Sequence, residues 1–332
     1  MLPLIGVTMG DPAGIGPEVA LAAAQLADVR ACCLPVLIGD PRRFAAIGGA
    51  EPLTEVAAPA QARDLPPTQV AVLPRGRVPA DLAWGRAEPA AGRAAVEVID
   101  TAIDLARAGE IHGVATAPVN KAAIVAAGIA FVGHTERFAE RTGTAEVAML
   151  LLGGRLRVAH VSTHVALRTA IERVRTPRIL TVIHLLDEGL RRLGTPAPRL
   201  AVAGLNPHAG ESGLFGDEDA REIAPAVAAA RSQGLACEGP LPPDTVFWRA
   251  ARGDFDGVVA MYHDQGHIAC KLLGFADGVN VTLGLPIVRT SVDHGTAYDI
   301  AGRGRADPTS MAAAIRTAAV LALNGRGASL LP

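Results

Sequence analysis

The chain has 332 residues, of which 50% are hydrophobic and only 3% are aromatic. This length allows one large α/β domain or two ordinary domains, and the aliphatic bias is typical of parallel sheets. The formal net charge is −2 and the basic residues are scattered, which argues against a nucleic-acid partner. There is no apolar run of membrane-spanning length, and the apolar start lacks the basic region of a signal peptide. We therefore expect a cytoplasmic protein that acts on a small molecule.

The first part of the chain alternates between apolar runs and Ala-rich stretches of helical length, the pattern of βαβ units. It predicts strands at Leu4–Met9, Pro35–Gly39 and Gly113–Thr116, and helices at Gly16–Ala27 and Gly92–Ala108. Asp40-Pro41 is a helix-start signal. Residues 51–92 are rich in Pro and Ala and poorly periodic. We expect an excursion or a short hairpin there, outside the core.

The alternation continues in the second part. Apolar runs predict strands at Val147–Leu152, Leu156–His160, Leu200–Gly204, Gly257–Tyr262 and Val279–Thr282. Helical patterns lie at Pro177–Leu193, Asp217–Gln233 and Pro308–Leu323. Polar motifs follow several of these strands, and ligands of open α/β sheets bind at the carboxyl ends of strands. The functional site is therefore expected at those ends.

The sequence leaves open the roles of a glycine-rich turn and of one cysteine. The turn Gly10–Glu18 has three glycines that would let its backbone approach a ligand, but a tight structural turn explains them equally well, so neither Asp11 nor Glu18 is assigned to catalysis. The four cysteines include no CxxC pair and are expected to be buried free thiols. The role of Cys270, seven positions after His263, stays open.

Three of the nine histidines, His164, His208 and His263, follow predicted strands. Imidazoles at the ends of three strands can converge on one point, and neutral imidazole is a common metal ligand. Their spacing of 44 and 55 residues matches no compact metal motif. Hydrogen-bonded loop histidines therefore remain an alternative.

A glycine-rich stretch from His294 to Pro308 reads HGTAYDIAGRGRADP. Small residues let a backbone approach a ligand, and the helix that follows offers its N-terminus to an anion. The stretch resembles the adenosine-binding loop of isopropylmalate and isocitrate dehydrogenases, HGSAPDIAGKGIANP, except that Asp307 replaces an Asn. The resemblance implies NAD contacts by His294, Gly295, Ala297, Asp299 and Ile300, with Asp299 accepting from a ribose hydroxyl. No GxGxxG follows a strand, which argues against an ordinary Rossmann site.

Further motifs run from end to end of the chain: Gly6–Glu18, Thr116–Lys121, Gly133–Glu136, Asn206–Glu211, Gly239–Thr245, Tyr262–Gly266, Gly278–Pro286, Arg289 and Asp293–Thr296. Together they resemble the 4-hydroxythreonine-4-phosphate dehydrogenase family, which belongs to the isocitrate/isopropylmalate dehydrogenase-like superfamily. The resemblance implies two α/β/α domains with a cleft between them. Residues 1–135 with 290–332 would carry the NAD loop, and residues 136–289 the metal ligands and dimer contacts.

The resemblance also implies roles for single residues. A divalent metal (zinc, cobalt or magnesium) is held in that family at the positions of His164, His208 and His263, and the partner subunit of a homodimer contributes the third. Substrate contacts fall on His134, Thr135, Lys271, Asn280 and Arg289. Independently, Arg289 and Asn280 offer a charged fork and an amide to a carboxylate or phosphate. A helix from Asp264 would carry Lys271 back towards the cleft, to assist proton transfer or hold the substrate anion.

The implied reaction oxidises 4-phosphohydroxy-L-threonine to 2-amino-3-oxo-4-phosphooxybutanoate, which then loses carbon dioxide. NAD or NADP takes the hydride, and a metal on the hydroxyl oxygen lowers its pKa.

Alternatives stay open. Asp264–Phe275 resembles more closely a paralogous branch that acts on 4-phospho-D-threonate or 4-phospho-erythronate, and another branch oxidises cis-dihydrodiol dicarboxylates. A metal-dependent hydrolase or isomerase would use the three histidines without NAD and would not need the loop at 294–307. A non-catalytic sugar-phosphate-binding protein would not bind NAD.

Overall fold

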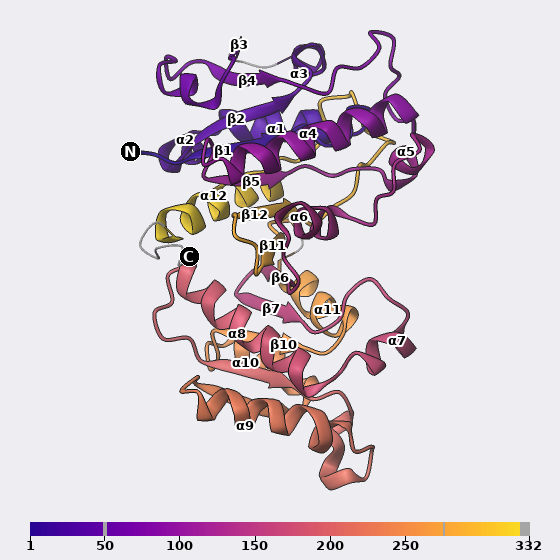
Figure 1. Cartoon of the computed structure of the whole chain (residues 1–332), viewed down its shortest axis with the longest axis vertical. Coiled ribbons are helices and arrows are strands. Elements are labelled where there is room, and N and C mark those ends of the chain that lie inside the picture. The colour runs from indigo at the N-terminus through magenta and orange to yellow at the C-terminus, as the bar shows by residue number, and fades with distance from the viewer. Residues whose placement is uncertain (49–51, 275, 326–332) are drawn as a thin grey trace. The chain divides into compact units, whose positions relative to one another are not determined.

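The structure is a computed structural model that describes residues 1–48, 52–274 and 276–325. It divides into two compact units, residues 1–144 with 285–332 (unit 1) and residues 145–284 (unit 2). Both units combine strands with packed helices (Figure 1), so the predicted α/β class is confirmed. Phe275 of the Asp264–Phe275 motif and residues 326–332 of the predicted first domain lie outside the described residues. Within the described residues, none of the helices has the length and apolar character that crossing a membrane requires.

The strands of unit 1 all run parallel. Their order is β3 (Leu53–Glu55), β4 (Val70–Pro74), β2 (Leu34–Gly39), β1 (Leu4–Thr8), β5 (Gly113–Thr116) and β12 (Arg289–Val292). In the register, Gly6 of β1 lies opposite Val36 and Val114. Every residue of β1 is buried, as expected for a parallel strand covered on both faces.

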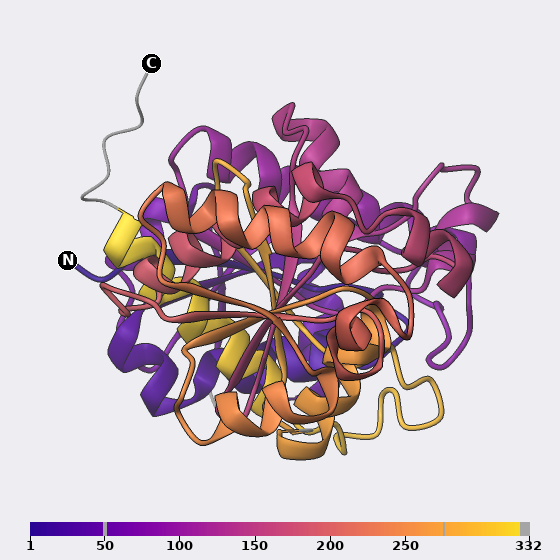
Figure 2. The ribbon, with the colours of Figure 1, turned by 90° about the horizontal axis from the view of Figure 1, so that it is seen from below.

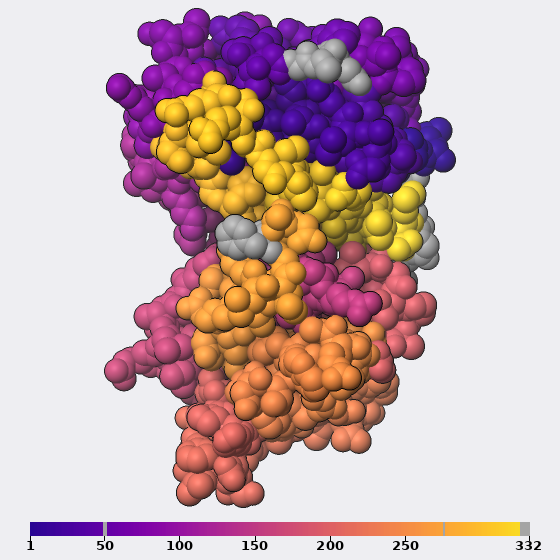
Figure 3. Space-filling view, turned by 180° about the vertical axis from the view of Figure 1, so that it is seen from behind, coloured from indigo at the N-terminus to yellow at the C-terminus, as the bar shows by residue number. Residues whose placement is uncertain are grey.

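The helices of unit 1 are α1 (Gly16–Gln25), α2 (Ala27–Cys32), α3 (Pro41–Ile47), the 3-10 turn η1 (Pro59–Arg63), α4 (Pro89–Arg107), α5 (Lys121–Ala126), α6 (His134–Thr142) and α12 (Thr309–Asn324). The predicted helix start at Asp40 is confirmed, because its carboxylate accepts from the Arg42 N–H at 3.0 Å. Helix α12 packs beside α1 and α2, and Figure 3 shows its yellow surface against the indigo N-terminal residues.

The expectation for residues 51–92 was wrong. Two parallel strands lie there, β3 beside β4 and β4 beside β2, and Val72 is fully buried. Strands β3 and β4 are therefore part of the sheet and do not form a hairpin outside the core. A buried strand of five residues has no alternating pattern to reveal it, and the Pro-rich flanks suggested a loop.

Unit 2 combines antiparallel and parallel pairing. The order is β11 (Val279–Leu283), β6 (Ala148–Gly153), β7 (Leu156–His160), β10 (Gly257–Ala260), β8 (Leu200–Ala203) and β9 (Cys237–Leu241). Pairing is antiparallel from β11 through β6 to β7, and parallel from β7 through β10 and β8 to β9. The five strands predicted here are confirmed. Strand β9 was missed because its Gly and Pro are untypical of strands.

Helices cover both faces of the unit 2 sheet. They are α7 (Leu167–Glu172), α8 (Thr176–Arg192), α9 (Ala224–Ser232), α10 (Pro243–Ala251) and α11 (His263–Leu273), with the turns η2 (Pro207–Gly213) and η3 (Asp219–Ile223). Phe247 of α10 and Cys270 of α11 join Val158 and Val258 in one core cluster. On the other face, Gly257 leaves room for leucines of α8. Figure 2 shows helices on either side of the strands. The four cysteines are free, and all but Cys32 are buried.

Candidate functional site

A buried arginine anchors the first group of predicted site residues. Arg289 on β12 is 4% exposed, and its Nη2 donates to the Thr116 hydroxyl at 2.9 Å. Its Nη1 lies 3.5 Å from the hydroxyl oxygen of Thr135 on α6. Arg289 and Thr135 were predicted as substrate contacts, and the structure brings them together. Thr116 was not predicted, although a polar residue at the carboxyl end of a parallel strand was a usable signal.

The imidazole of His134 lies in the same part of unit 1 and is neutral. Burial, followed by the positive charges of Arg289 and Lys121, lowers the pKa of His134 well below its usual value. Its Nε2 is buried and has no hydrogen-bond partner within the described part of the chain. Such an atom points to a ligand that supplies the missing hydrogen bond.

The same residues lie at a helix N-terminus. His134 and Thr135 are the first two residues of α6, and Gly133 precedes them. A helix N-terminus offers backbone N–H groups and a partial positive charge to an anion. Burial lowers the pKa of Arg289 to about 10, which leaves it charged at neutral pH. We call Thr116, His134, Thr135 and Arg289 the anion cluster, because together they suit a phosphate or a carboxylate.

The predicted dinucleotide loop follows β12 in unit 1. Its turn is tight, since Ala297 has a φ of 40° and its carbonyl accepts from the Ile300 N–H at 3.1 Å. His294 Nδ1 lies 3.0 Å from the Gly295 carbonyl oxygen, and its Nε2 is buried without a partner in the described residues. Asp299 is exposed. An unsatisfied imidazole nitrogen and an exposed carboxylate on one loop are compatible with a bound dinucleotide. The NAD contacts themselves stay a prediction.

Asp307 has a structural role at the end of this loop. Its carboxylate accepts from the Thr309 N–H at 2.9 Å and from the Thr309 hydroxyl at 2.6 Å. These hydrogen bonds lower the pKa of Asp307. The carboxylate thus holds the first turn of α12, where an acidic group is favourable.

Histidine rings gather in unit 2 near the carboxyl ends of β7 and β10. The ring centroids of His164 and His263 are 5.5 Å apart, so two of the three predicted metal ligands are close neighbours. His267 stacks on His263, and its Nδ1 lies 3.2 Å from the Nε2 of His160. His160 and His267 were not predicted. The position of His267, four residues after His263 on a helix, was the available signal.

The hydrogen bonding of His263 fits a metal ligand. Its Nδ1 is 2.6 Å from the Asp264 carboxylate, and this hydrogen bond lowers the pKa of Asp264. With the Nδ1 proton directed at the carboxylate, Nε2 carries the lone pair that a metal binds. Histidines that ligate metals commonly have such a carboxylate partner.

His208, the remaining predicted ligand, follows β8, the strand beside β10. It begins a left-handed turn in which residues 208–212 all have φ between 40° and 82°. Four of these five residues are not glycine, and such strain is often found at functional sites. In residues 1–48, 52–274 and 276–325, no three His, Cys, Asp or Glu side chains come together as a metal site. One described chain therefore brings together His164 and His263 but not the full predicted set.

Two predicted substrate contacts occupy elements of unit 2. Helix α11 begins at His263, one residue before its predicted start, and Lys271 lies on it two turns later. Asn280 lies on β11 opposite Leu151 of β6. Their roles stay predictions.

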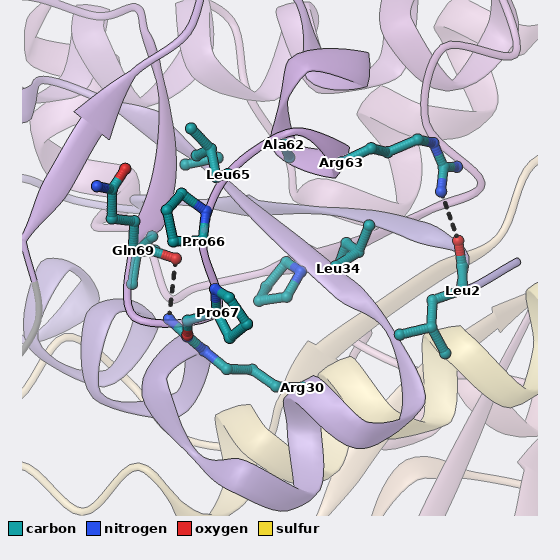
Figure 4. Close-up of a pocket in the computed structure, with 12 residues that line it drawn as sticks. Leu2, Arg30, Leu34, Ala62, Arg63, Leu65, Pro66, Pro67 and Gln69 are labelled. Carbon is teal, nitrogen blue, oxygen red and sulfur yellow. Dashed lines mark hydrogen bonds between the residues drawn. The ribbon is translucent and has the colours of Figure 1, made fainter.

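Unit 1 also contains a cavity whose lining includes none of the predicted site residues. It has a volume of about 240 Å³ and an apolar lining that includes Leu34, Leu65 and Pro66 (Figure 4). Its two arginines donate to backbone carbonyls, Arg30 to Pro67 and Arg63 to Leu2. The guanidinium groups are engaged in holding the chain, so we assign this cavity no function.

Comparison with known proteins gives concordant matches. Residues 31–318 match the family described as "Pyridoxal phosphate biosynthetic protein PdxA". A 4-hydroxythreonine-4-phosphate dehydrogenase of Desulfosudis oleivorans is 52% identical over 94% of both chains. A D-threonate 4-phosphate dehydrogenase of Cupriavidus necator is 49% identical over 97% of this chain and 98% of its own. The crystal structure of a 4-hydroxythreonine-4-phosphate dehydrogenase from Klebsiella pneumoniae aligns with a TM-score of 0.88 at 48% identity, covering 97% of this chain and 98% of that one.

Proposed function

Because the chain belongs to the PdxA family and is a dehydrogenase of phosphorylated hydroxy acids, we propose that it uses NAD and a divalent metal ion to oxidise a four-carbon hydroxy acid 4-phosphate. The anion cluster carries this proposal. It combines a buried arginine, two hydroxyls and a neutral imidazole at the N-terminus of α6. A phosphate or carboxylate would offset the desolvation cost of the buried guanidinium through charge-assisted hydrogen bonds, which few other small ligands can form.

We place 4-phospho-D-threonate first among the substrates. It has a hydroxyl at C2, where 4-phosphohydroxy-L-threonine has an ammonium group. The positive charges of Arg289 and Lys121 act on His134, and such cations disfavour an ammonium group. The Glu136 carboxylate, which acts on Arg289, offsets part of this positive charge. The C. necator relative and the resemblance of the sequence Asp264–Phe275 to the threonate branch support the same choice.

The amino acid 4-phosphohydroxy-L-threonine is the second candidate. The D. oleivorans relative named for it is 52% identical to this chain. With this substrate the reaction would be the one that supplies pyridoxal phosphate biosynthesis. NAD is the expected hydride acceptor, and NADP is the alternative.

The side chains divide the work as follows. Arg289 and the hydroxyls of Thr116 and Thr135 hold the substrate anion, and His134 donates or accepts one hydrogen bond as a neutral ring. Lys271 assists proton transfer from the hydroxyl oxygen at C3 or holds the substrate anion. When bound, the metal supplies charge stabilisation at that oxygen, and NAD supplies the hydride acceptor.

The metal site would be completed in a homodimer. His164 and His263 of one chain lie together, and Asp264 orients His263. Helix α11, which begins at His263, exposes large apolar side chains: Ile268 is 62%, Leu272 80% and Leu273 54% exposed. An apolar helix face next to a metal ligand suits burial against a second copy. We therefore propose a shared site to which the partner subunit contributes one of the three histidines.

The substrate is tested by following NADH formation with 4-phospho-D-threonate, 4-phospho-D-erythronate, 4-phosphohydroxy-L-threonine and a cis-dihydrodiol dicarboxylate. The highest kcat/KM is expected with 4-phospho-D-threonate. Preference for the amino acid would establish the second candidate. Activity on the diol alone would exclude both phosphorylated substrates, and metal-dependent turnover without NAD would point to a hydrolase or isomerase.

The metal requirement is tested separately. His208→Ala is compared with His184→Ala, a control whose imidazole lies 2.6 Å from the Gln233 side chain on the surface of unit 2. Chelator treatment should abolish turnover of the wild type, and zinc, cobalt or magnesium should restore it. His208→Ala should remain inactive under all conditions. Normal turnover of the chelator-treated His208→Ala protein would disprove the metal role.

A further inference from the structure

Two buried acids near the dinucleotide loop have no part in the chemistry above. Asp11 is 1% exposed in the glycine-rich turn between β1 and α1, and Glu18 is 4% exposed in the first turn of α1. Asp11 Oδ2 accepts from the Tyr298 hydroxyl at 2.6 Å, and Oδ1 accepts from the Ala13 N–H at 2.7 Å. Glu18 Oε1 accepts from the Gly302 N–H. Two carboxylates of one short segment thus hold the loop at points four residues apart.

The backbones of the turn and the loop also touch at Thr296, two residues before Tyr298. The Ile15 N–H donates to the Thr296 carbonyl at 3.0 Å. A Cβ at Gly14 would lie 2.9 Å from the backbone oxygen of Thr296, so a larger residue would push the loop away. Gly14 therefore allows contact with the loop itself, which explains this glycine without a direct ligand contact.

An aromatic ring supports the far end of the loop. A Cβ at Gly302 would lie 2.6 Å from the Trp84 ring, which shows how closely the loop backbone approaches the indole. The guanidinium carbon of Arg43 lies 3.5 Å from the centre of the same ring, and Arg43 donates twice to the Pro12 carbonyl at 3.0 and 2.6 Å. The turn, the loop and Trp84 therefore form one packed assembly within unit 1.

Burying these acids is costly, which argues that their position matters. Burial raises the pKa of Asp11, although the hydrogen bond from Tyr298 opposes the shift. The second oxygen of Glu18, Oε2, is buried without a hydrogen-bond partner in the residues described. An apolar side chain would avoid these costs but would not accept from the loop.

We propose that Asp11 and Glu18 are positioning residues that hold residues 294–302 in the conformation that binds NAD. The inference rests on the proposed function, because it requires this loop to bind the dinucleotide. Neither acid needs to touch NAD. Their effect is to hold the Ala297–Ile300 turn in place before the cofactor arrives, which lowers the ordering cost of binding.

The test uses variants that remove one loop contact each. Tyr298→Phe keeps the ring and removes the hydroxyl that donates to Asp11, while Glu18→Leu removes the acceptor for Gly302. Glu18→Gln retains an acceptor oxygen and should behave as the wild type. Asp187→Asn is the control, because Asp187 is a buried carboxylate of unit 2 paired with Arg191.

Calorimetric titration with NAD and steady-state kinetics provide the first readouts. Tyr298→Phe and Glu18→Leu should raise the Kd and KM for NAD by roughly tenfold, the equivalent of one lost hydrogen bond to a charged group. Both kcat at saturating NAD and the KM for the phosphorylated substrate should stay within about twofold of the wild type, as expected when only ground-state binding of NAD is lost. Asp187→Asn should leave NAD affinity unchanged.

Hydrogen exchange provides a readout without cofactor. Amides of residues 295–302 should exchange faster in Tyr298→Phe and Glu18→Leu than in the wild type or Glu18→Gln. If the wild type binds NAD and these two variants bind it equally well, the inference is wrong and the proposed function stands. If the wild type does not bind NAD, the proposed function fails and the inference fails with it.

Discussion

The imidazole rings of His263 and His267 stack with their centroids 3.7 Å apart and their planes 11° apart. His267 Nδ1 lies 3.1 Å from the His263 carbonyl oxygen and 3.2 Å from the Nε2 of His160. His160 is 1% exposed, and its Nδ1 lies 3.3 Å from the Met149 carbonyl oxygen. A line of three rings thus leads from the core of unit 2 to a proposed metal ligand, and it restricts the orientation of His263.

Replacing His267 should therefore weaken metal binding although His267 is not one of the proposed ligands. We expect His267→Leu to raise the Kd for zinc by roughly tenfold or more, in the range seen when groups behind metal ligands are lost. A competition titration against a chromophoric chelator measures this Kd. His267→Phe, which keeps a stacking ring but loses the nitrogen facing His160, should lie between the wild type and His267→Leu. An unchanged zinc affinity in His267→Leu would show that the stack has no role in holding His263.

Arg289→Lys should impair substrate binding despite conserving the charge. A lysine ammonium lacks the planar fork with which Arg289 donates to Thr116 and lies near Thr135. We expect the KM for the phosphorylated substrate to rise by about 100-fold, which corresponds to about 2.7 kcal/mol, while the Kd for NAD stays unchanged. Thr116→Val removes one hydroxyl and should raise the same KM by a smaller factor. Equal KM values for Arg289→Lys and the wild type would remove Arg289 from the substrate site.

Acid should destabilise the protein through His160. Burial, together with the nearby His267, lowers the pKa of His160 to about 3, whereas an unfolded histidine titrates near its ordinary value of 6.5. Below pH 6.5 the unfolded state therefore binds a proton that the folded state does not. The contribution of the neutral His160 to the free energy of unfolding is thus complete above pH 6.5 and is lost as the pH drops towards 3. The loss is at most about 1.4 kcal/mol per pH unit for one group.

Urea unfolding of the chelator-treated protein between pH 7.5 and 5 measures this dependence, since metal release then makes no contribution. The matched variant is His160→Asn, in which the titrating group is absent. The difference in free energy of unfolding between wild type and variant should shrink as the pH falls. A difference that is independent of pH would contradict a neutral, buried His160.

The sequence predicted those parts of the molecule that depend on local pattern. Strands β5 and β7 have the predicted bounds because their apolar runs are bounded by Gly and other turn residues. The proximity of His164 and His263 follows from the parallel pairing of β7 with β10, which brings their carboxyl ends together. The strand bounds and the proximity of the two histidines could be predicted because both depend only on where the strands end.

Contacts between distant segments could not be predicted in this way. Tyr298 and Asp11 are 287 positions apart, and neither the glycine-rich turn nor the loop contains a signal that names the other as its partner. His160 was predicted only as the end of a strand, and its contact with His267 depends on how α11 packs on β7. Whether a polar residue faces the core or a ligand is decided by packing, which periodicity does not specify.

The left-handed turn that carries His208 should limit the stability of the protein. Ser212 has a φ of 57° and a ψ of 29° in an exposed position, a conformation that costs a residue with a Cβ about 1 kcal/mol. Ser212→Gly removes this strain and should raise the free energy of unfolding by about 1 kcal/mol, less a fraction lost to the greater freedom of glycine in the unfolded chain. Ser232→Gly is the control, because Ser232 is an exposed residue at the end of α9 where glycine relieves no strain, and it should give no gain. Urea unfolding of the chelator-treated variants measures both values. If Ser212→Gly lowered the free energy of unfolding as much as Ser232→Gly, the turn would not be strained at this residue. The orientation of His208 would then have to be maintained by its surroundings. One such contact is the Asp219 carboxylate, which accepts from the N–H groups of Leu205 and Asn206.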